Sequence, residues 1–230
     1  MTQHCTLSHF DNNSAVIHGV SSSATGPFVK VATVFPPFGH NPTVTRSPDG
    51  YYLIYFIGKE RDRQVDCTAP GSERLETAAG APMWKPDTDV INVAWSKSIY
   101  GPWQQRSILR AASPTDPQTR WNCHNSNPAP LVLANGTVLL MYRGSACDRV
   151  GSGCGKNKPN TCEQQGIAVA THWNSTYHRR PEPIALSPGG FEDAFFWRSS
   201  RGFHALFHAK AACGDELVGV CGAMAFSLDS

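Results

Sequence analysis

One segment of this chain occurs three times, and this repetition restricts the possible folds more than any other feature. NPTVTRSPDGYYLIYFIG at 41–58 aligns without a gap with NPAPLVLANGTVLLMYRG at 127–144. DAFFWRSSRGFHALFHAK at 193–210 falls into the same register, with Asp193 in the place of the two asparagines. Each copy has the pattern of a short strand, a turn that closes on glycine, and a longer apolar strand. The chain is therefore expected to be built from copies of one supersecondary unit.

A second motif follows the repeated segments. NVAWSKSIYGPW at 92–103 matches HGVSSSATGPF at 18–28, with two serines and a Gly-Pro-aromatic triplet in common, and looser versions lie at 167–177 and 222–230. The order is half a unit, two whole units with loop insertions, and a unit cut off at its third strand. Four antiparallel strands per unit are typical of a β-propeller, whereas a β-sandwich would not repeat a motif pair in fixed order.

We therefore predict an all-β fold, a β-propeller that contains about three and a half blades. Frequent proline (17) and glycine (20) residues and the near absence of helical periodicity agree with a turn-rich β protein. Because the chain starts and stops inside blades, we expect residues 1–230 to form a single propeller domain that is cut short at both ends.

Composition excludes several classes of partner. The chain is 40% hydrophobic and 17% charged, with a formal net charge of +2, as in an ordinary soluble globular protein. It has no cluster of lysine and arginine, so neither nucleic acid nor an anionic membrane is expected as a partner. No stretch approaches the roughly 18 apolar residues of a membrane span. We expect a monomer.

Cysteines and glycosylation sequons point to a secretory compartment. The eight cysteines form no C-x-x-C pair, which favours disulfides over zinc, and three N-x-[ST] sequons start at Asn12, Asn135 and Asn174. MTQHCTLSHF at the N-terminus has no apolar region and is not a signal peptide. We therefore expect an extracellular or secretory-pathway protein, and this chain to be a piece of a longer one.

The repeated motifs resemble those of glycoside hydrolases. SNPAPLVLANGTVLLMYRG at 126–144, IAVATHWNSTY at 167–177 and FEDAFFW at 191–197 resemble the N-P-A, L-L-Y-R, A-x-S and E-D-P sequence of family 130, which contains mannoside phosphorylases and hydrolases. An acidic residue or Asn before Pro, followed by D-G-x-Y-Y-L-x-Y, is similar to family 43, which holds arabinofuranosidases and xylosidases. The resemblance covers nearly the whole chain as architecture and implies a five-bladed propeller.

The resemblance also implies roles for particular residues. In family 43 the Asp before Pro in the first blade is the general base, a later blade supplies an Asp that tunes the acid, and the Glu of an E-G-P-like motif is the general acid. Glu192 matches the acid, but Asn41 and Asn127 stand where carboxylates would be, and Ala194 stands in place of Pro. This chain thus departs from the usual two-carboxylate inverting mechanism.

The comparison with family 130 requires fewer departures. Asn127 and the Tyr142-Arg143 pair match that family, and Glu192 with Asp193 matches its E-D.

The aligned strand starts are the best candidates for a functional site. The innermost strand of each propeller blade lines a central funnel, so equivalent positions of separate blades meet at one mouth. We predict Glu192 and Asp193 as catalytic residues and His40, Asn41 and Asn127 as substrate-binding residues. Amides and imidazoles bind sugar hydroxyls, and a carboxyl group beside aromatic residues can be kept protonated as an acid. Alternatively, the Asn-Pro pairs are only turns, in which Asn bonds the backbone two residues on.

Three more residues are predicted to bind substrate. Arg143 ends an apolar strand, where it would clamp a carboxylate of the protein or an anion of the substrate. His208 lies near the end of the third copy, and Trp84 lies in an inserted loop, where aromatic residues stack on sugar faces or cover a blade edge. No spacing of His and Asp is typical of a metal site, and no cofactor is expected.

Three functions remain open from the sequence. The first is a secreted carbohydrate-active enzyme, a glycosidase or glycoside phosphorylase, with Glu192 and Asp193 at the funnel mouth and an oligo- or polysaccharide as substrate. The second is a non-catalytic carbohydrate-binding propeller that has lost its general base. The third is a propeller scaffold for protein partners.

Overall fold

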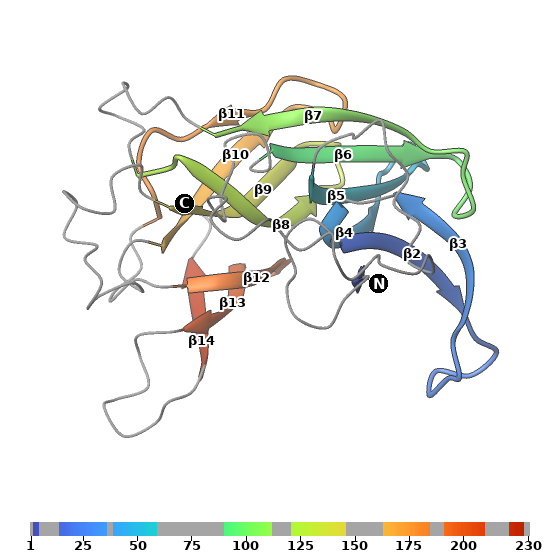
Figure 1. Ribbon diagram of the computed structural model, residues 1–230. Helices are drawn as coiled ribbons and strands as arrows, with labels where there is room; N and C mark the ends of the chain where they lie inside the picture. Colours follow the sequence, from blue (N-terminus) through green and yellow to red (C-terminus); the bar gives the residue numbers. More distant parts are fainter. Residues whose placement is uncertain are drawn as a thin grey trace, which may run out of the picture.

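The chain folds into antiparallel sheets that follow one another in sequence order (Figure 1). The computed structural model describes residues 2–4, 14–35, 39–58, 90–111, 121–145, 163–184, 191–209 and 221–227. Trp84 and the cysteines other than Cys123 and Cys221 lie outside these ranges, so the predictions made for them stay predictions. No helix long and apolar enough to cross a membrane occurs among the described residues.

The first two sheets come from the N-terminal half. The first sheet has the order β1-β2-β3 and is formed by β1 (Thr2–His4), β2 (Ser14–Val20) and β3 (Val29–Phe35). The second sheet has the order β4-β5-β6-β7 and is formed by β4 (Gly39–Arg46), β5 (Tyr52–Gly58), β6 (Val90–Ser96) and β7 (Gln104–Arg110).

The last two sheets repeat this plan. The third sheet has the order β8-β9-β10-β11 and is formed by β8 (His124–Val132), β9 (Val138–Ser145), β10 (Glu163–Ala170) and β11 (His178–Arg179). The fourth sheet has the order β12-β13-β14 and is formed by β12 (Phe191–Ser199), β13 (Gly202–Ala209) and β14 (Cys221–Ser227). Sheets of three, four, four and three strands correspond to three and a half four-stranded blades, as the repeat predicts.

Consecutive sheets pack face to face, and each contact is a hydrophobic cluster. Val16 and Phe35 of the first sheet pack on Ile54 and Phe56 of the second. A larger cluster joins the second sheet to the third through residues of β5, β6, β7, β9 and β10. Phe191 and other residues of the fourth sheet pack on the third. Sheets stacked in chain order, with their strands also in chain order, have the arrangement of successive propeller blades.

The apolar run of β5 is explained by this stacking. Side chains of a strand alternate between the two faces of its sheet. Leu53 and Tyr55 face the third sheet, whereas Ile54 and Phe56 face the first. Because both faces are covered, the whole strand is apolar and no polar alternation appears in its sequence.

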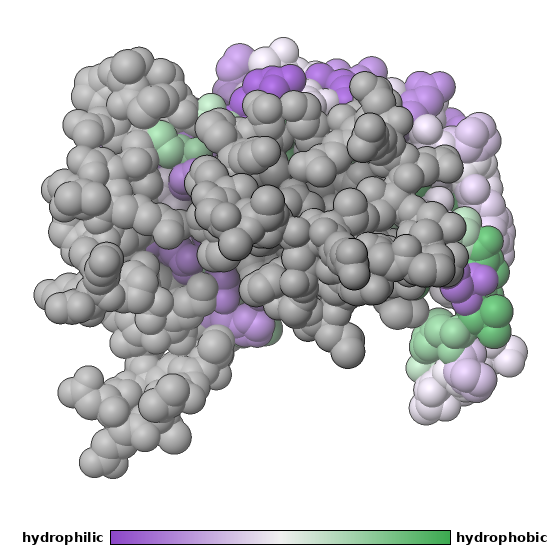
Figure 2. Space-filling model, viewed as in Figure 1, coloured by the Kyte–Doolittle hydropathy of each residue, from purple (hydrophilic) through white to green (hydrophobic). Residues whose placement is uncertain are grey.

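The fourth sheet differs because described apolar residues on one of its faces are exposed. In β13, Ala205 and Phe207 are buried against the third sheet, while Leu206 remains 44% exposed. Phe195 of β12, which is opposite Leu206 in the sheet register, is 64% exposed. Apolar residues are also exposed on the β2–β3 hairpin, seen as the green area at the right of Figure 2. Of the eight large exposed apolar residues among the described residues, six lie in the first and last sheets, and the other two, Val44 and Tyr100, lie in the second.

The turn glycines predicted by the repeat adopt positive φ values in all three copies. Gly50, Gly136 and Gly202 have φ values of 85°, 89° and 133°. Residues with a Cβ rarely adopt such values, so glycine is favoured at each turn. The sequence alignment therefore corresponds to a structural repeat.

Candidate functional site

The three aligned strand starts share an unusual backbone conformation. Asn41, Asn127 and Asp193 have φ values of 48°, 51° and 50° and are the positive-φ residues other than glycine in the part of the chain that the structure describes. Each lies in a register irregularity of its strand pair. Asn and Asp tolerate the left-handed conformation better than other residues with a Cβ, because their short polar side chains bond nearby backbone groups. The left-handed backbone thus favours Asn or Asp at each strand start.

The three left-handed residues line one shallow pocket of about 220 Å³, together with the residues that follow them: Asn41, Pro42, Thr43, Asn127, Pro128, Asp193 and Ala194. The predicted convergence of equivalent positions is therefore present in the structure. The volume is below the roughly 300–1,000 Å³ of pockets for drug-sized ligands, so the pocket suits a smaller ligand.

Polar contacts join the strand starts across the pocket. The Oγ1 hydroxyl of Thr43 donates a hydrogen bond of 2.9 Å to the carbonyl oxygen of Pro128, which joins the first start to the second. The Nδ2 amide of Asn127 donates to Oδ1 of Asp193, which joins the second start to the third. Asn127 is 9% exposed, whereas the Asp193 side chain is 44% exposed. The pocket therefore presents a carboxylate that a buried amide holds in position.

Arg143 is placed beside the pocket by β9 and contacts two carboxylates of the protein. Its Nη1 forms an ion pair with Oε2 of Glu192 and a second one, at 3.3 Å, with Oε1 of Glu163. Its Nε donates to Oγ of Ser126 at 2.7 Å. The side chains of Arg143, Glu163 and Glu192 are only 15–18% exposed. The sequence left open whether Arg143 contacts a carboxylate of the protein or an anion of the substrate. The structure shows contacts with protein carboxylates.

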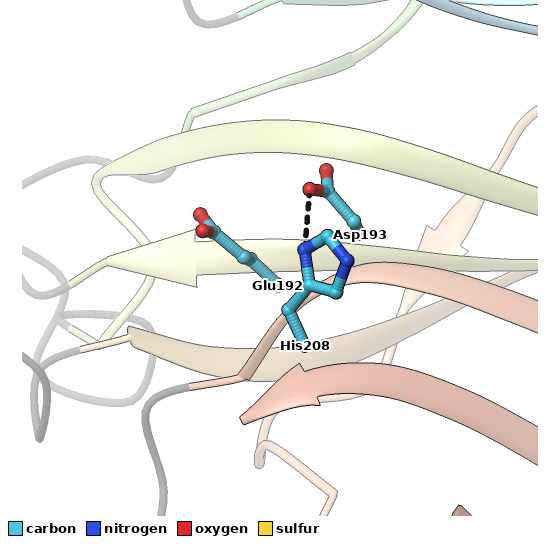
Figure 3. Close-up of side chains that lie close together, drawn as sticks. All are labelled: Glu192, Asp193 and His208. Carbon is cyan, nitrogen blue, oxygen red and sulfur yellow. Dashed lines mark ion pairs between the residues drawn. The ribbon is translucent and has the colours of Figure 1, made fainter. Parts of the chain in front are cut away.

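Asp193 has a second partner in the neighbouring strand. Nδ1 of His208 lies 3.0 Å from Oδ2 of Asp193, and Figure 3 shows the imidazole turned toward that carboxylate. Asn127 and His208 thus contact different oxygens of one carboxylate. Glu192 is the direct partner of His208 in the β12–β13 register. The structure therefore brings together Glu192, Asp193, Asn127, Arg143 and His208.

Two other predicted residues are placed differently. His40 is half-buried in β4 next to Asn41 and is not among the residues that line the pocket. Trp84 lies outside the described residues. The roles that the sequence suggested for all eight site residues stay predictions.

Sequence reasoning missed three residues of this region. Glu163 and Gln165 come from β10, directly after a long insertion, and no repeat marks them. Gln165 is 1% exposed and donates from Nε2 to the carbonyl oxygen of Phe191 at 2.6 Å, which fixes the start of β12. Thr43 is the third residue of a repeated segment, but its equivalents are Ala129 and Phe195, so the repeat gives no signal for it.

Tyr142 belongs to the core and not to the pocket. It is fully buried between the second and third sheets, and its hydroxyl accepts a hydrogen bond of 3.0 Å from Nδ2 of Asn122. Burial raises the pKa of Tyr142 to about 12. Of the Tyr142-Arg143 pair, Arg143 alone reaches the strand starts, because neighbouring residues of a strand point to opposite faces.

Known structures share this fold. The chain matches Zg3597, a family 117 glycoside hydrolase of the marine bacterium Zobellia galactanivorans, with a TM-score of 0.60 and 13% identity over 97% of this chain and 57% of that one. It matches the endo-arabinase from Bacteroides thetaiotaomicron with a TM-score of 0.53 and 12% identity, over 94% of this chain and 66% of that one. A thermostable family-43 glycoside hydrolase matches with a TM-score of 0.53 and 14% identity, over 85% and 57%.

These similarities establish the fold. The fold is that of β-propeller glycoside hydrolases, which confirms the predicted fold class and the resemblance to family 43 at the level of architecture. The chain spans 57% to 66% of the length of these three structures. Comparison with protein-family models finds no match. Comparison with curated proteins finds none either.

Proposed function

We propose that the chain is part of a secreted carbohydrate-active propeller that cleaves a glycosidic bond at the pocket of the three strand starts. One observation carries this proposal: equivalent positions of three consecutive blades converge on a pocket that is lined by one carboxylate, that of Asp193, and by the amide side chains of Asn41 and Asn127. Amides suit sugar hydroxyls, and a carboxylate supplies the acid–base chemistry of glycoside hydrolysis. Glycoside hydrolases of families 43 and 117 share the fold.

The two carboxylates are suited to different tasks. Asp193 lines the pocket, and its side chain is 44% exposed, so it can reach a bound substrate or its attacking water. Glu192 is 18% exposed and pairs with Arg143. To act as the proton donor, Glu192 must take up a proton and part from the guanidinium group. We therefore assign the base to Asp193 and retain Glu192 as the acid of the proposed reaction.

A second candidate function is a carbohydrate-binding propeller without catalysis. It is favoured by Asn41 and Asn127, which stand where family 43 has carboxylates, and by the ion pair that occupies Glu192. Amide side chains bind hydroxyls but do not transfer protons, so a pocket lined by them would hold a sugar without cleaving it.

One experiment separates the two functions. The purified chain is incubated with a panel of arabinosides, xylosides, mannosides, galactosides and their oligosaccharides, with and without phosphate, and released sugar is measured. Binding to the same glycans is measured by affinity electrophoresis. Release of sugar supports the enzyme. Binding without release supports the binding module. If the chain neither releases sugar nor binds glycans, both functions are contradicted and a scaffold is favoured.

Secretion is part of the same proposal and has its own test. Asn135 and Asn174 are exposed in turns of the third sheet, where a glycosyltransferase can reach them. Expressed in a eukaryotic secretory pathway from an added signal peptide, the chain should lose mass on enzymatic deglycosylation. It should also move more slowly in electrophoresis after reduction, because the predicted disulfides keep it compact. An unchanged mass and mobility would contradict the secretory assignment.

A further inference from the structure

Exposed apolar residues gather around the β2–β3 hairpin. Of the eight large exposed apolar residues among the described ones, five come from this hairpin and from the β6–β7 turn, and we call them the hairpin patch: Val20, Phe28, Val29, Val31 and Tyr100. Val20 is paired with Val29 in the sheet register, and the ring centroid of Tyr100 lies 5.3 Å from that of His18 in β2. The hairpin is the green area at the right of Figure 2. A contiguous apolar patch on a surface marks an interaction site.

The strand β3 lies at the outer edge of its sheet. The first sheet has the order β1-β2-β3, and none of the described strands pairs with the other side of β3. The sequence of β3, VKVATVF, contains one charged residue, and its first five residues are exposed. Valine favours the strand conformation, and an edge strand presents backbone N–H and C=O groups to a further strand. The strand is therefore an exposed apolar edge.

The second sheet contains the equivalent strand, β7. Both β3 and β7 follow a copy of the Gly-Pro-aromatic motif, and each is the last strand of its sheet. The motif glycines, Gly26 and Gly101, have φ values of 82° and 88°. The two strands thus occupy the same place in two copies of one unit, and their edges can be compared directly.

The edge of β7 carries polar and charged residues where the edge of β3 carries valine. At the offset of 75 residues, Val29 and Val31 stand in the places of Gln104 and Arg106. Val29 and Val31 are 65% and 50% exposed, whereas Arg106 donates from Nη2 to the carbonyl oxygen of Ser175 in the third sheet at 2.6 Å. Charged residues on an edge strand oppose its pairing with another sheet. The edge of β7 is protected in this way, and the edge of β3 favours a further strand.

The chemistry of this edge favours a second copy of the chain as its partner. Two identical strands related by a two-fold axis pair antiparallel, so that the N–H and C=O groups of each meet those of the other. An apolar edge strand is thus complementary to itself. A bilayer is a poorer partner, because the tip of the hairpin at 21–25 is polar and Oγ of Ser23 is bonded to Oγ1 of Thr25 at 2.9 Å.

We propose that two copies of the chain associate through β3, with their first sheets joined edge to edge and the hairpin patches buried at the junction. Main-chain hydrogen bonds and the burial of valine side chains would both stabilise this dimer. The pocket is lined by residues of β4, β8 and β12, so the dimer does not involve the pocket. The inference therefore does not depend on the proposed function.

The sequence led us to expect a monomer. Composition and charge do not show which strand lies at the edge of a sheet, or whether the valines of that strand are covered. Both depend on how the strands pair and how the sheets stack, so the difference between the two edges becomes visible in the structure.

Sedimentation velocity of the purified full chain over a wide range of protein concentrations tests the association. We expect a reversible change from monomer to dimer as the concentration rises. Val31→Lys places a charge in the shared sheet and should weaken the association at least about tenfold. Leu206→Lys is the matched control, since Leu206 is an apolar residue of the fourth sheet that is 44% exposed, and it should associate as the unaltered chain does. Circular dichroism checks that both variants are folded.

Hydrogen exchange locates the interface without any variant. Amides in a peptide that covers β3 should exchange more slowly at high than at low protein concentration, because pairing protects them. Amides of β7 lie outside the proposed interface and should exchange at the same rate at both concentrations.

Several outcomes would overturn the proposal. A monomer at every concentration is sufficient by itself, as is an association that Val31→Lys leaves unchanged. A loss in Leu206→Lys as large as that in Val31→Lys would assign the contact to the fourth sheet. Co-sedimentation of a monomeric chain with phosphatidylcholine vesicles would assign the hairpin patch to a lipid surface instead. Sugar cleavage by a chain that stays monomeric would leave the proposed function standing and remove the dimer.

Discussion

The first two strand starts and the third have one backbone and opposite chemistry. His40-Asn41-Pro42 and Ser126-Asn127-Pro128 carry amides before proline, whereas Glu192-Asp193-Ala194 carries two carboxylates. The φ values of the middle residues agree within a few degrees (48°, 51° and 50°). The junction of the first start with the second includes the neutral bond from Thr43 to Pro128. The junction of the second with the third is charged.

This difference shows how a repeated backbone is used for two purposes. The third sheet supplies the partners of the third strand start: Asn127 contacts Asp193, and Arg143 contacts Glu192. Carboxylates placed at the first start would need similar partners to be tolerated at a half-buried position. Acidic groups are therefore found where a neighbouring blade compensates them, and the repeat as such determines only the backbone.

The largest expected effect comes from making the third start like the other two. Asp193→Asn keeps the shape and the left-handed backbone but removes the carboxylate from the pocket. If the chain is a glycosidase, the rate should fall about 10³-fold, the usual contribution of a general base. Sugar release on a substrate found by the panel measures this change. Asp49→Asn is the control and should keep its rate, because Asp49 does not line the pocket although its Oδ2 lies 3.4 Å from Nε2 of His172. An unchanged rate in Asp193→Asn would remove Asp193 from the mechanism.

The next effect is on stability at the charged junction. Arg143→Met leaves Glu163 and Glu192 without their shared guanidinium group in a region 15–18% exposed. The free energy of unfolding should fall by about 3 kcal/mol, as for removal of one partner of a buried ion pair. Urea denaturation measures the loss. Arg201→Met, in the exposed turn between β12 and β13, should change stability by less than about 0.5 kcal/mol. Equal losses in the two variants would show that the junction contributes nothing.

A smaller effect tests whether the three backbones are equally restricted. At Asn41 and at Asn127, substitution by Ala should cost about 1–2 kcal/mol more than substitution by Gly, because Ala is strained at positive φ. Both variants of Asn127 also lose the bond to Asp193, so the difference between Ala and Gly isolates the backbone. Thermal unfolding of the four variants gives the comparison. Equal stability of the Ala and Gly variants at either position would contradict a shared left-handed conformation.

The smallest effect concerns the neutral junction. Thr43→Val removes the donor to the Pro128 carbonyl oxygen and keeps the shape of the side chain. The free energy of unfolding should fall by about 0.5–1 kcal/mol, the net value of one hydrogen bond. Urea denaturation in parallel with Arg143→Met measures the neutral and the charged junction under the same conditions. A loss for Thr43→Val as large as that for Arg143→Met would erase the difference between the two junctions.

Much of the architecture was predictable because its causes are local. Gly50, Gly136 and Gly202 mark turns by their freedom at positive φ, and the apolar runs of β5 and β9 follow from burial on both faces. The alignment of the three Asx residues predicts the pocket, since equivalent positions of stacked blades must meet. The fold and the convergence of Asn41, Asn127 and Asp193 therefore follow from residue patterns along the chain.

The partner that each charged side chain contacts inside the site was not predictable in this way. Arg143 could have faced a substrate anion, but the packing of β9 against β10 and β12 gives it Glu163 and Glu192. Glu163 follows an insertion that has no equivalent in the other copies, so no alignment points to it. His208 meets Asp193 only because a register irregularity turns the carboxylate toward β13.

The sequence by itself determined the repeat, the turns and the left-handed strand starts, because steric restrictions on φ act on single residues and their neighbours. Tertiary structure decided which carboxylate faces the pocket and which is paired with Arg143. Ion pairs and hydrogen bonds between blades depend on distances of a few ångströms between residues far apart in the chain, and these distances are set by how the sheets stack.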